Sequence, residues 1–69
     1  MVAPSLIHVR FVSRYGWTVE REGLPAPLSS HCAQSVAERV ARALAQRERG
    51  RIYVHNLVGD VIRSDSYVP

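Results

Sequence analysis

Apolar residues recur at every second position near both ends of this chain, and at every fourth position in its middle. The segment 7–12 alternates apolar and polar residues, which is typical of a strand with one buried face. The segment 17–21 alternates in the same way after a turn that contains Gly16, whose missing side chain permits a positive φ. Because the link between them is short, the two segments are predicted to form a β-hairpin.

The segment 33–49 has the period of a helix. Val36, Val40 and Leu44 fall on one predicted apolar stripe. The alanines on its flank, which a sheet can approach closely, are Ala33, Ala37 and Ala41. The polar residues on the opposite side, which we expect to face solvent, are Arg39, Arg42, Gln46 and Arg49.

Signals at both ends of this segment support a helix. Ser29 or Ser30 is the expected N-terminal cap, and Gly50 is the expected C-terminal cap. Glu38 and Arg42 have the i,i+4 spacing of a helix ion pair. The connector 23–28 holds two prolines and is predicted to be irregular.

Two further strands are expected after the helix, at 51–55 and 61–63, joined by a turn at 56–60. The predicted architecture is a single α+β domain spanning 1–69, with an ordered core of about 6–67. It is a two-layer ββαββ fold, in which one helix packs on one face of a mostly antiparallel sheet. The second sheet face is left uncovered and is therefore a candidate for dimerisation or ligand contact.

The chain is short for a stable core. A domain of 69 residues buries only about 60% of its unfolded surface, and small domains of this size often gain stability from disulfides, metals or oligomerisation. A single cysteine, Cys32, excludes an intrachain disulfide. We therefore expect a homodimer.

The chain also carries signals about its compartment. It has no apolar stretch long enough to span a membrane and no signal-peptide pattern at residues 1–6. One unpaired cysteine favours a reducing environment. These features predict a cytoplasmic location in a bacterium or its phage, with no membrane partner.

All nine basic residues are arginine, and the formal net charge is +3. The segment 36–51 carries this excess, because it has five arginines against two glutamates. The candidate contacts for a partner or a nucleic acid are therefore Arg39, Arg42, Arg47, Arg49 and Arg51. No nucleic-acid-binding motif and no aromatic platform accompanies them, so nucleic acid is the alternative partner rather than the favoured one.

Aromatic residues and a histidine supply the candidate interface. Trp17 is a core residue if its strand face meets the helix, and an interface anchor if it lies on the open face. The alternation at 51–55 places Tyr53 and His55 opposite the apolar Ile52 and Val54. The candidate interface residues are Trp17, Tyr53, His55 and Tyr67.

No residue pattern dictates a reaction, so we expect a non-enzymatic protein with no cofactor and no metal. Cys32 with His31 or His55 suggests a nucleophile–base dyad, but a fold this small leaves little room for a pocket around it. The same holds for Ser66, His55 and Asp65 as a triad. His8 and His55 lie on different strands whose faces can coincide, yet four zinc ligands with paired short spacings are absent.

The string Gly16-Trp17-Thr18-Val19-Glu20-Arg21-Glu22-Gly23 resembles the G-W-x-V-x-R-E-G signature of domain-of-unknown-function family 2188. The resemblance continues through spaced helix alanines, an Ile-x-Val-His strand, and a closing Asp-Ser-Tyr, and it covers roughly residues 7–67. Departures occur at Cys32, Val68 and the turn Val58-Gly59-Asp60, where the family usually has an acidic residue, a glycine and a charged Asp-Gly-Arg. Since the function of this family is unknown, the resemblance implies a fold and no activity.

Two functions therefore remain open. The favoured one is an interaction module of a bacterium, phage or mobile element, which binds a protein and itself, as a phage-type inhibitor of a host system would. It predicts an exposed apolar face and salt-tolerant self-association. The alternative is an accessory nucleic-acid-binding protein that uses the arginine-rich helix, whose binding would collapse as salt increases.

Overall fold

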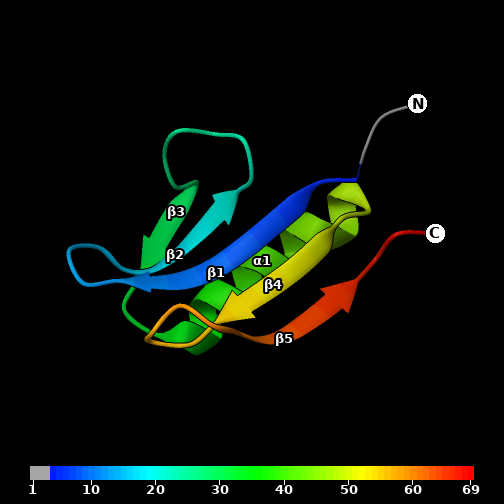
Figure 1. Cartoon of the computed structure of the whole chain (residues 1–69). Helices are drawn as coiled ribbons and strands as arrows, with labels where there is room; N and C mark the ends of the chain where they lie inside the picture. Colours follow the sequence, from blue (N-terminus) through cyan, green and yellow to red (C-terminus); the bar gives the residue numbers. More distant parts are fainter. Residues whose placement is uncertain (1–3) are drawn as a thin grey trace.

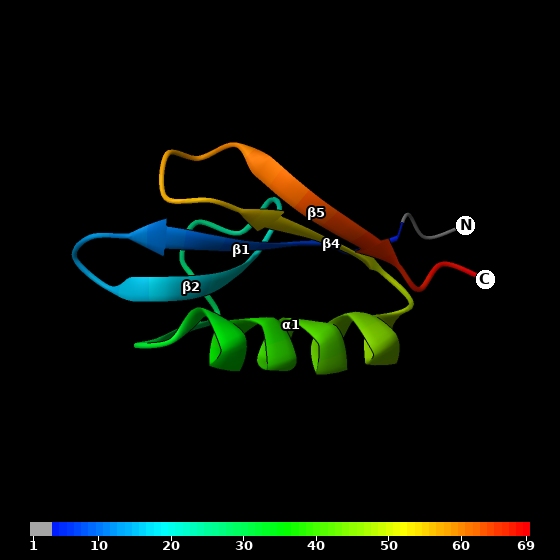
Figure 2. The same cartoon turned by 90° about the horizontal axis from the view of Figure 1, so that it is seen from below.

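The computed structural model describes residues 4–69, which form one five-stranded sheet and one helix (Figure 1). The elements in chain order are β1 (Leu6–Val12), β2 (Gly16–Arg21), β3 (Ser29–His31), α1 (Gln34–Glu48), β4 (Arg51–His55) and β5 (Val61–Ser66). The order of strands across the sheet is β3-β2-β1-β4-β5. The helix lies beneath one face of this sheet, so the predicted two-layer α+β fold is confirmed (Figure 2).

The predicted hairpin is present, and its register explains the apolar alternation. β1 pairs antiparallel with β2, so that Val9 lies opposite Val19 and Phe11 lies opposite Trp17. Residues directly opposite each other share a sheet face. The alternating apolar side chains of both strands therefore point to the same side, toward α1.

The helix connects two parallel strands. β4 runs parallel to β1, with Ile7 opposite Ile52, and every other pair in the sheet is antiparallel. A parallel pair needs a long crossover, which β2, β3 and α1 supply together. This arrangement places β1 and β4 at the centre of the sheet, above the helix (Figure 1).

The core is formed by aliphatic side chains of the sheet and by alanines of the helix. The buried aliphatic residues are Ile7, Val9, Val19, Ile52 and Val54, and the buried helix residues are Ala37, Ala41 and Ala45. The predicted helix stripe was therefore offset. The alanines lie at its centre and Val40 and Leu44 pack on its flank, because methyl side chains let the helix backbone come closest to the sheet.

The expected N-terminal cap was wrong. Ser29 and Ser30 belong to β3, an additional short edge strand, where they pair with Val19 and Thr18 of β2. The helix begins at Gln34, and its N-cap residue Ala33 makes no side-chain capping bond. The serines therefore lie in a strand that ends before the N-cap position, and neither of them is the residue that precedes the helix.

The expected C-terminal cap was also wrong by one residue. Arg49 takes the left-handed conformation at φ 54°, and its backbone N–H donates to Ala45. The next residue, Gly50, has a different role. The carbonyl oxygen of Ser5 occupies the space that a Cβ atom at this position would need, so only glycine fits here. The role of Gly50 is thus to let β4 start close to β1, and the helix is ended by Arg49.

β5 is longer than the predicted 61–63 segment, since it continues to Ser66. The backbone N–H of Tyr67 then donates to the carbonyl of Gly50 at 2.9 Å, which holds the chain end against β4. β5 is an edge strand that lies beyond the helix, and most of its residues are exposed (Figure 2). Among the described residues, no helix is long and apolar enough to cross a membrane.

Candidate functional site

The helix arginines form a positive surface without acidic neighbours. Arg39, Arg42 and Arg49 are exposed, and no carboxylate within residues 4–69 forms an ion pair with them. The predicted Glu38–Arg42 pair is wrong, because Glu38 pairs instead with Arg63 of β5. Glu38 and Glu48 pair with residues of the sheet, so the arginines are the charged residues on the solvent side of α1.

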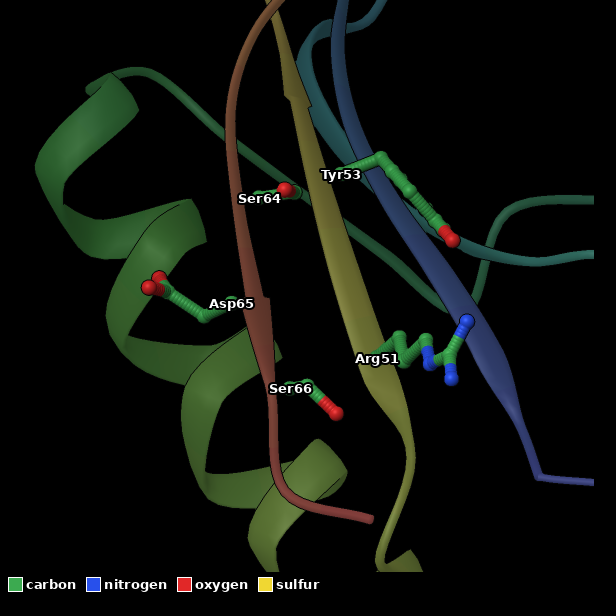
Figure 3. A pocket seen from close by; sticks show the side chains of 5 residues that line it. All are labelled: Arg51, Tyr53, Ser64, Asp65 and Ser66. Atoms are coloured by element: carbon green, nitrogen blue, oxygen red, sulfur yellow. The ribbon is translucent and has the colours of Figure 1, made fainter.

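The other two candidate arginines lie apart from this surface. Arg47 is on the flank of the helix, where it lines a groove with Arg21, Leu28, Val40 and Leu44. Arg51 belongs to β4 and points to the open face of the sheet (Figure 3). The structure therefore divides the five predicted contacts among three places rather than gathering them into one patch.

Glu48, the second helix glutamate, pairs with Arg21 of β2. A hydrogen bond from Ser5 and the contact with Arg21 hold the pKa of Glu48 below its ordinary value, against an opposing effect of burial. Glu48 is therefore charged throughout the neutral range, and it ties the last turn of the helix to the strand above it.

The open face of the sheet carries a cluster of rings. His8 of β1 stacks on Tyr53 of β4, with ring centroids 5.4 Å apart and an interplanar angle of 27°. His8 Nδ1 lies 2.9 Å from His55 Nε2, and His55 Nδ1 lies 3.0 Å from the carbonyl oxygen of Gly59. The two candidate interface residues Tyr53 and His55 are thus adjacent, and His8, which was not among those candidates, joins them.

Beside these rings the open face is polar. Arg10 Nε lies 3.5 Å from Glu20 Oε1, and the buried hydroxyl of Thr18 donates to Glu20 Oε2 at 2.7 Å. A buried hydroxyl needs a hydrogen-bond partner, and Thr18 has one in Glu20 on this face. The part of the open face formed by β1 and β2 is therefore polar and does not supply the exposed apolar face that the favoured function requires.

Trp17 and Tyr67 lie on the helix side. Both are half-buried and pack against the core. Trp17 meets Phe11 edge-on, with centroids 5.4 Å apart and an interplanar angle of 62°. Of the two roles left open for Trp17, the structure thus supports the core residue.

The most exposed large aliphatic side chains lie on the hairpin formed by β4 and β5. Leu57 and Val58 in its turn are 68% and 81% exposed, and Val61 and Ile62 at the start of β5 are 53% and 56% exposed. These four residues are called the hairpin tip below. The sequence analysis missed them, although adjacent apolar pairs in a turn and at the start of a strand cannot all face one core.

The hollow on the open face of the sheet is small. It measures about 220 Å³ and lies at β4 and β5, where Arg51, Tyr53 and Ser66 point to the open face while Asp65 points toward the helix (Figure 3). Ligand pockets usually measure about 300–1,000 Å³ and enclose most of the ligand. This hollow is therefore too small to enclose a small-molecule substrate.

The residues considered for a catalytic triad or a metal site are not grouped together in the structure. Asp65 and Ser66 lie on opposite faces of β5 (Figure 3), and the bonds of His55 go to His8 and Gly59. Cys32 is exposed and free. Within residues 4–69, no group of three histidine, cysteine, aspartate or glutamate side chains is placed to hold a metal ion.

Comparison with known proteins gives one match. Residues 7–67 match the model of a family described as an uncharacterised protein conserved in bacteria (DUF2188). No curated protein and no solved structure matches the chain. The match covers nearly every described element, from β1 to the residue after β5.

Proposed function

This chain belongs to domain-of-unknown-function family 2188, and we propose that it is a non-enzymatic, cytoplasmic interaction module of a bacterium or phage that binds proteins through its hairpin tip. The observation that supports this function is the exposure of Leu57, Val58, Val61 and Ile62 on one hairpin. Contiguous exposed apolar residues on a small protein are typical of a protein-binding surface.

The turn that carries the tip is held by its own polar groups. Asn56 Oδ1 accepts hydrogen bonds from the backbone N–H groups of Val58 and Asp60, each at 3.0 Å. The backbone N–H of Gly59 donates to the carbonyl of Asn56 at 3.1 Å. Because these bonds define the turn, Leu57 and Val58 are not required for packing and are presented in a fixed position, which lowers the entropy lost on binding.

A protein partner fits this surface better than a small molecule does. The turn between β4 and β5 projects from one end of the sheet (Figure 1), and the hollow beside these two strands measures only about 220 Å³. Apolar side chains projecting from a turn can insert into a recess of another protein, where each buried side chain contributes roughly 1.5–3 kcal/mol.

The test uses a double variant, Leu57→Ser with Val58→Ser, and a matched control, Arg39→Glu with Arg42→Glu. Proteins bound to the immobilised wild-type chain would be purified, and their affinities for all three chains measured by calorimetry. We expect at least a tenfold loss of affinity for the tip variant and no change for the arginine variant. Equal affinities for the wild-type and tip variants would refute the proposal.

A second candidate function is nucleic-acid binding by the helix, and it has an observation of its own. Glu38 and Glu48 are engaged by Arg63 and Arg21, which leaves the exposed side of α1 with uncompensated positive charge. Phosphate binding by such a surface weakens steeply with salt. Binding of a labelled oligonucleotide that is lost in the arginine variant, kept in the tip variant, and abolished at moderate salt would favour this function over the first.

A further inference from the structure

We infer that the exposed edge of β5 pairs with β5 of a second copy of this chain, antiparallel and about a two-fold axis at Ser64. This inference rests on the proposed function, since it names one protein partner and adds the neighbouring strand edge to the binding surface. Four features of β5 carry it: the direction of its backbone groups, the order of its charges, its bulge and its apolar end.

The direction of the backbone groups follows from one hydrogen bond. The N–H of Tyr67 points to Gly50 of β4, and the groups of alternate residues on a strand point the same way. Asp65 and Arg63 therefore also direct their N–H and C=O groups toward β4. The backbone N–H and C=O groups of Ser64 and Ser66 therefore point away from β4, past the edge of the sheet, where another strand can bond to them.

The side chains of the same segment are self-complementary. Arg63 and Asp65 lie two positions apart, opposite Val54 and Ile52, and so they share the helix face. If β5 meets its own copy antiparallel with Ser64 opposite the partner's Ser64, Arg63 lies opposite the partner's Asp65. The two-fold axis produces this pair twice, and opposite charges facing each other across a strand pair stabilise it.

Both charged groups can make this contact. Arg63 pairs with Glu38 and its side chain is still 48% exposed, and a guanidinium has enough donors for two carboxylates. Asp65 has no ion pair within residues 4–69. A second copy would supply the cation that this half-buried carboxylate lacks.

Other registers are disfavoured. An axis at Arg63 or Asp65 would place like charges opposite each other and would bring together backbone groups that already bond β4. An axis at Ile62 would fall on the irregularity where the pairing of β4 with β5 shifts by one residue, and such bulges interrupt pairing. An axis at Ser66 would leave the partner's Tyr67 opposite Asp65. Ser64 is therefore the centre that satisfies both backbone and charge.

The apolar residues extend this interface. With Ser64 at the axis, Ile62 lies opposite the partner's Ser66, so the start of one β5 lies beside the end of the other. Val61 and Ile62 are exposed in the isolated chain, and Tyr67 is half-buried. Because the two copies meet along one strand edge, we expect a contact below the roughly 800 Å² per partner of a standard complex, and a dimer that dissociates at micromolar concentrations.

Cross-linking tests the register. In a background with Cys32→Ser, the variant Ser64→Cys would place the two sulfhydryl groups across the axis. The Cα atoms of directly opposed, hydrogen-bonded residues lie about 5.5 Å apart, which a disulfide can span. Ser66→Cys is the matched control, because its own copy lies about four residues away along the strand, near 13 Å. We expect Ser64→Cys to oxidise to a disulfide-linked dimer and Ser66→Cys to form no disulfide between copies.

Charge reversal tests the pairing independently. Arg63→Asp alone would place aspartates opposite the partner's Asp65, and Asp65→Arg alone would place arginines opposite each other. Each variant is expected to be monomeric where the wild-type chain is dimeric by light scattering. An equimolar mixture of the two restores both ion pairs, so we expect a heterodimer, and circular dichroism would establish that each variant is folded.

The outcomes separate this inference from the proposed function. Two results would overturn β5 pairing while leaving a self-binding module. The first is equal cross-linking of the Ser64→Cys and Ser66→Cys variants. The second is a dimer that persists in both charge variants. A wild-type chain that is monomeric at all concentrations would also overturn β5 pairing, and the hairpin tip would then be judged by its affinity for other proteins.

Discussion

His8 Nδ1 and His55 Nε2 lie 2.9 Å apart, although the two residues are 47 positions apart in the chain. The parallel pairing of β1 with β4 brings them together on the open face of the sheet. They are the middle of a longer series of contacts, because His55 Nδ1 lies 3.0 Å from the carbonyl oxygen of Gly59 and His8 Nε2 lies 3.4 Å from a carboxylate oxygen of Glu22.

The number of protons in this series is limited. Two neutral imidazoles carry two N–H protons, whereas three contacts to acceptors need three. Burial lowers the pKa of His8, and the charge of Arg10 and the proximity of His55 lower it further, against the opposing effect of Glu22. When both rings are neutral, one contact therefore lacks a proton, and the longest contact, from His8 to Glu22, is the one that fits.

The first prediction concerns the titration of His8. Replacing Glu22 by glutamine removes the group that favours the charged imidazole, so the pKa of His8 should fall further below its ordinary value of 6.5. Replacing Arg10 by glutamine removes a repelling charge and should raise that pKa. Nuclear magnetic resonance of the imidazole protons measures both, and shifts of the same sign in the two variants would contradict this account.

The same lowered pKa predicts the pH dependence of stability. The unfolded chain binds a proton at His8 more readily than the folded chain does, so the free energy of unfolding decreases as the pH falls from about 6.5 toward the folded pKa. Denaturant unfolding at a series of pH values measures this slope. The slope should be smaller in a His8→Gln variant, which has no imidazole at this position.

The second prediction concerns the closeness of the helix to the sheet. Ala41 is fully buried beneath the strands, so Ala41→Leu should destabilise the fold by about 1–3 kcal/mol through overpacking. Ala43 is exposed on the same helix, and Ala43→Leu is the control, with an expected change within about 0.5 kcal/mol. Equal free energies of unfolding for the two variants would show that the alanine stripe is not tightly packed.

The third prediction separates two roles of glycine. Gly16 and Gly23 both have a positive φ, of 87° and 94°, so alanine at either position should cost roughly 1–2 kcal/mol of backbone strain. A Cβ at Gly16 would also lie 2.7 Å from the carbonyl oxygen of His31, whereas nothing lies within 4 Å at Gly23. Thermal unfolding should therefore show a larger loss for Gly16→Ala, and a reversed order would mean that β3 yields easily.

The fourth prediction concerns acid. The pKa of Glu48 is lowered by the hydrogen bond from Ser5 and by Arg21, so this carboxylate stabilises the fold above its ordinary pKa of 4.5, and that contribution is lost as the pH falls through the lower folded pKa. Glu48→Gln should flatten the acid limb of a stability–pH curve while costing under about 1 kcal/mol at neutral pH. Arg21→Gln should raise the pKa of Glu48, and an unchanged carboxylate titration in that variant would argue against the ion pair.

The strands and the helix could be predicted because their signals are local. The alternation in 7–12 and 17–21 predicts a hairpin that the register of β1 with β2 confirms. The spacing of alanines predicts a surface on which a sheet can sit, and Ala37 and Ala41 are indeed buried. Periodicity depends on a side chain and its near neighbours, which the sequence contains directly.

The candidate surfaces could be predicted only in part, because they depend on residues distant in sequence. The local spacing favoured a Glu38–Arg42 pair, but β5 brings Arg63 to Glu38. Nothing near Ser29 indicates that it would pair with Val19 rather than cap a helix. The sequence by itself thus determined which residues alternate and which recur at helical spacing. Only the tertiary structure decided which charges are paired, which rings meet and which apolar residues remain in water, since long-range strand pairing sets those contacts.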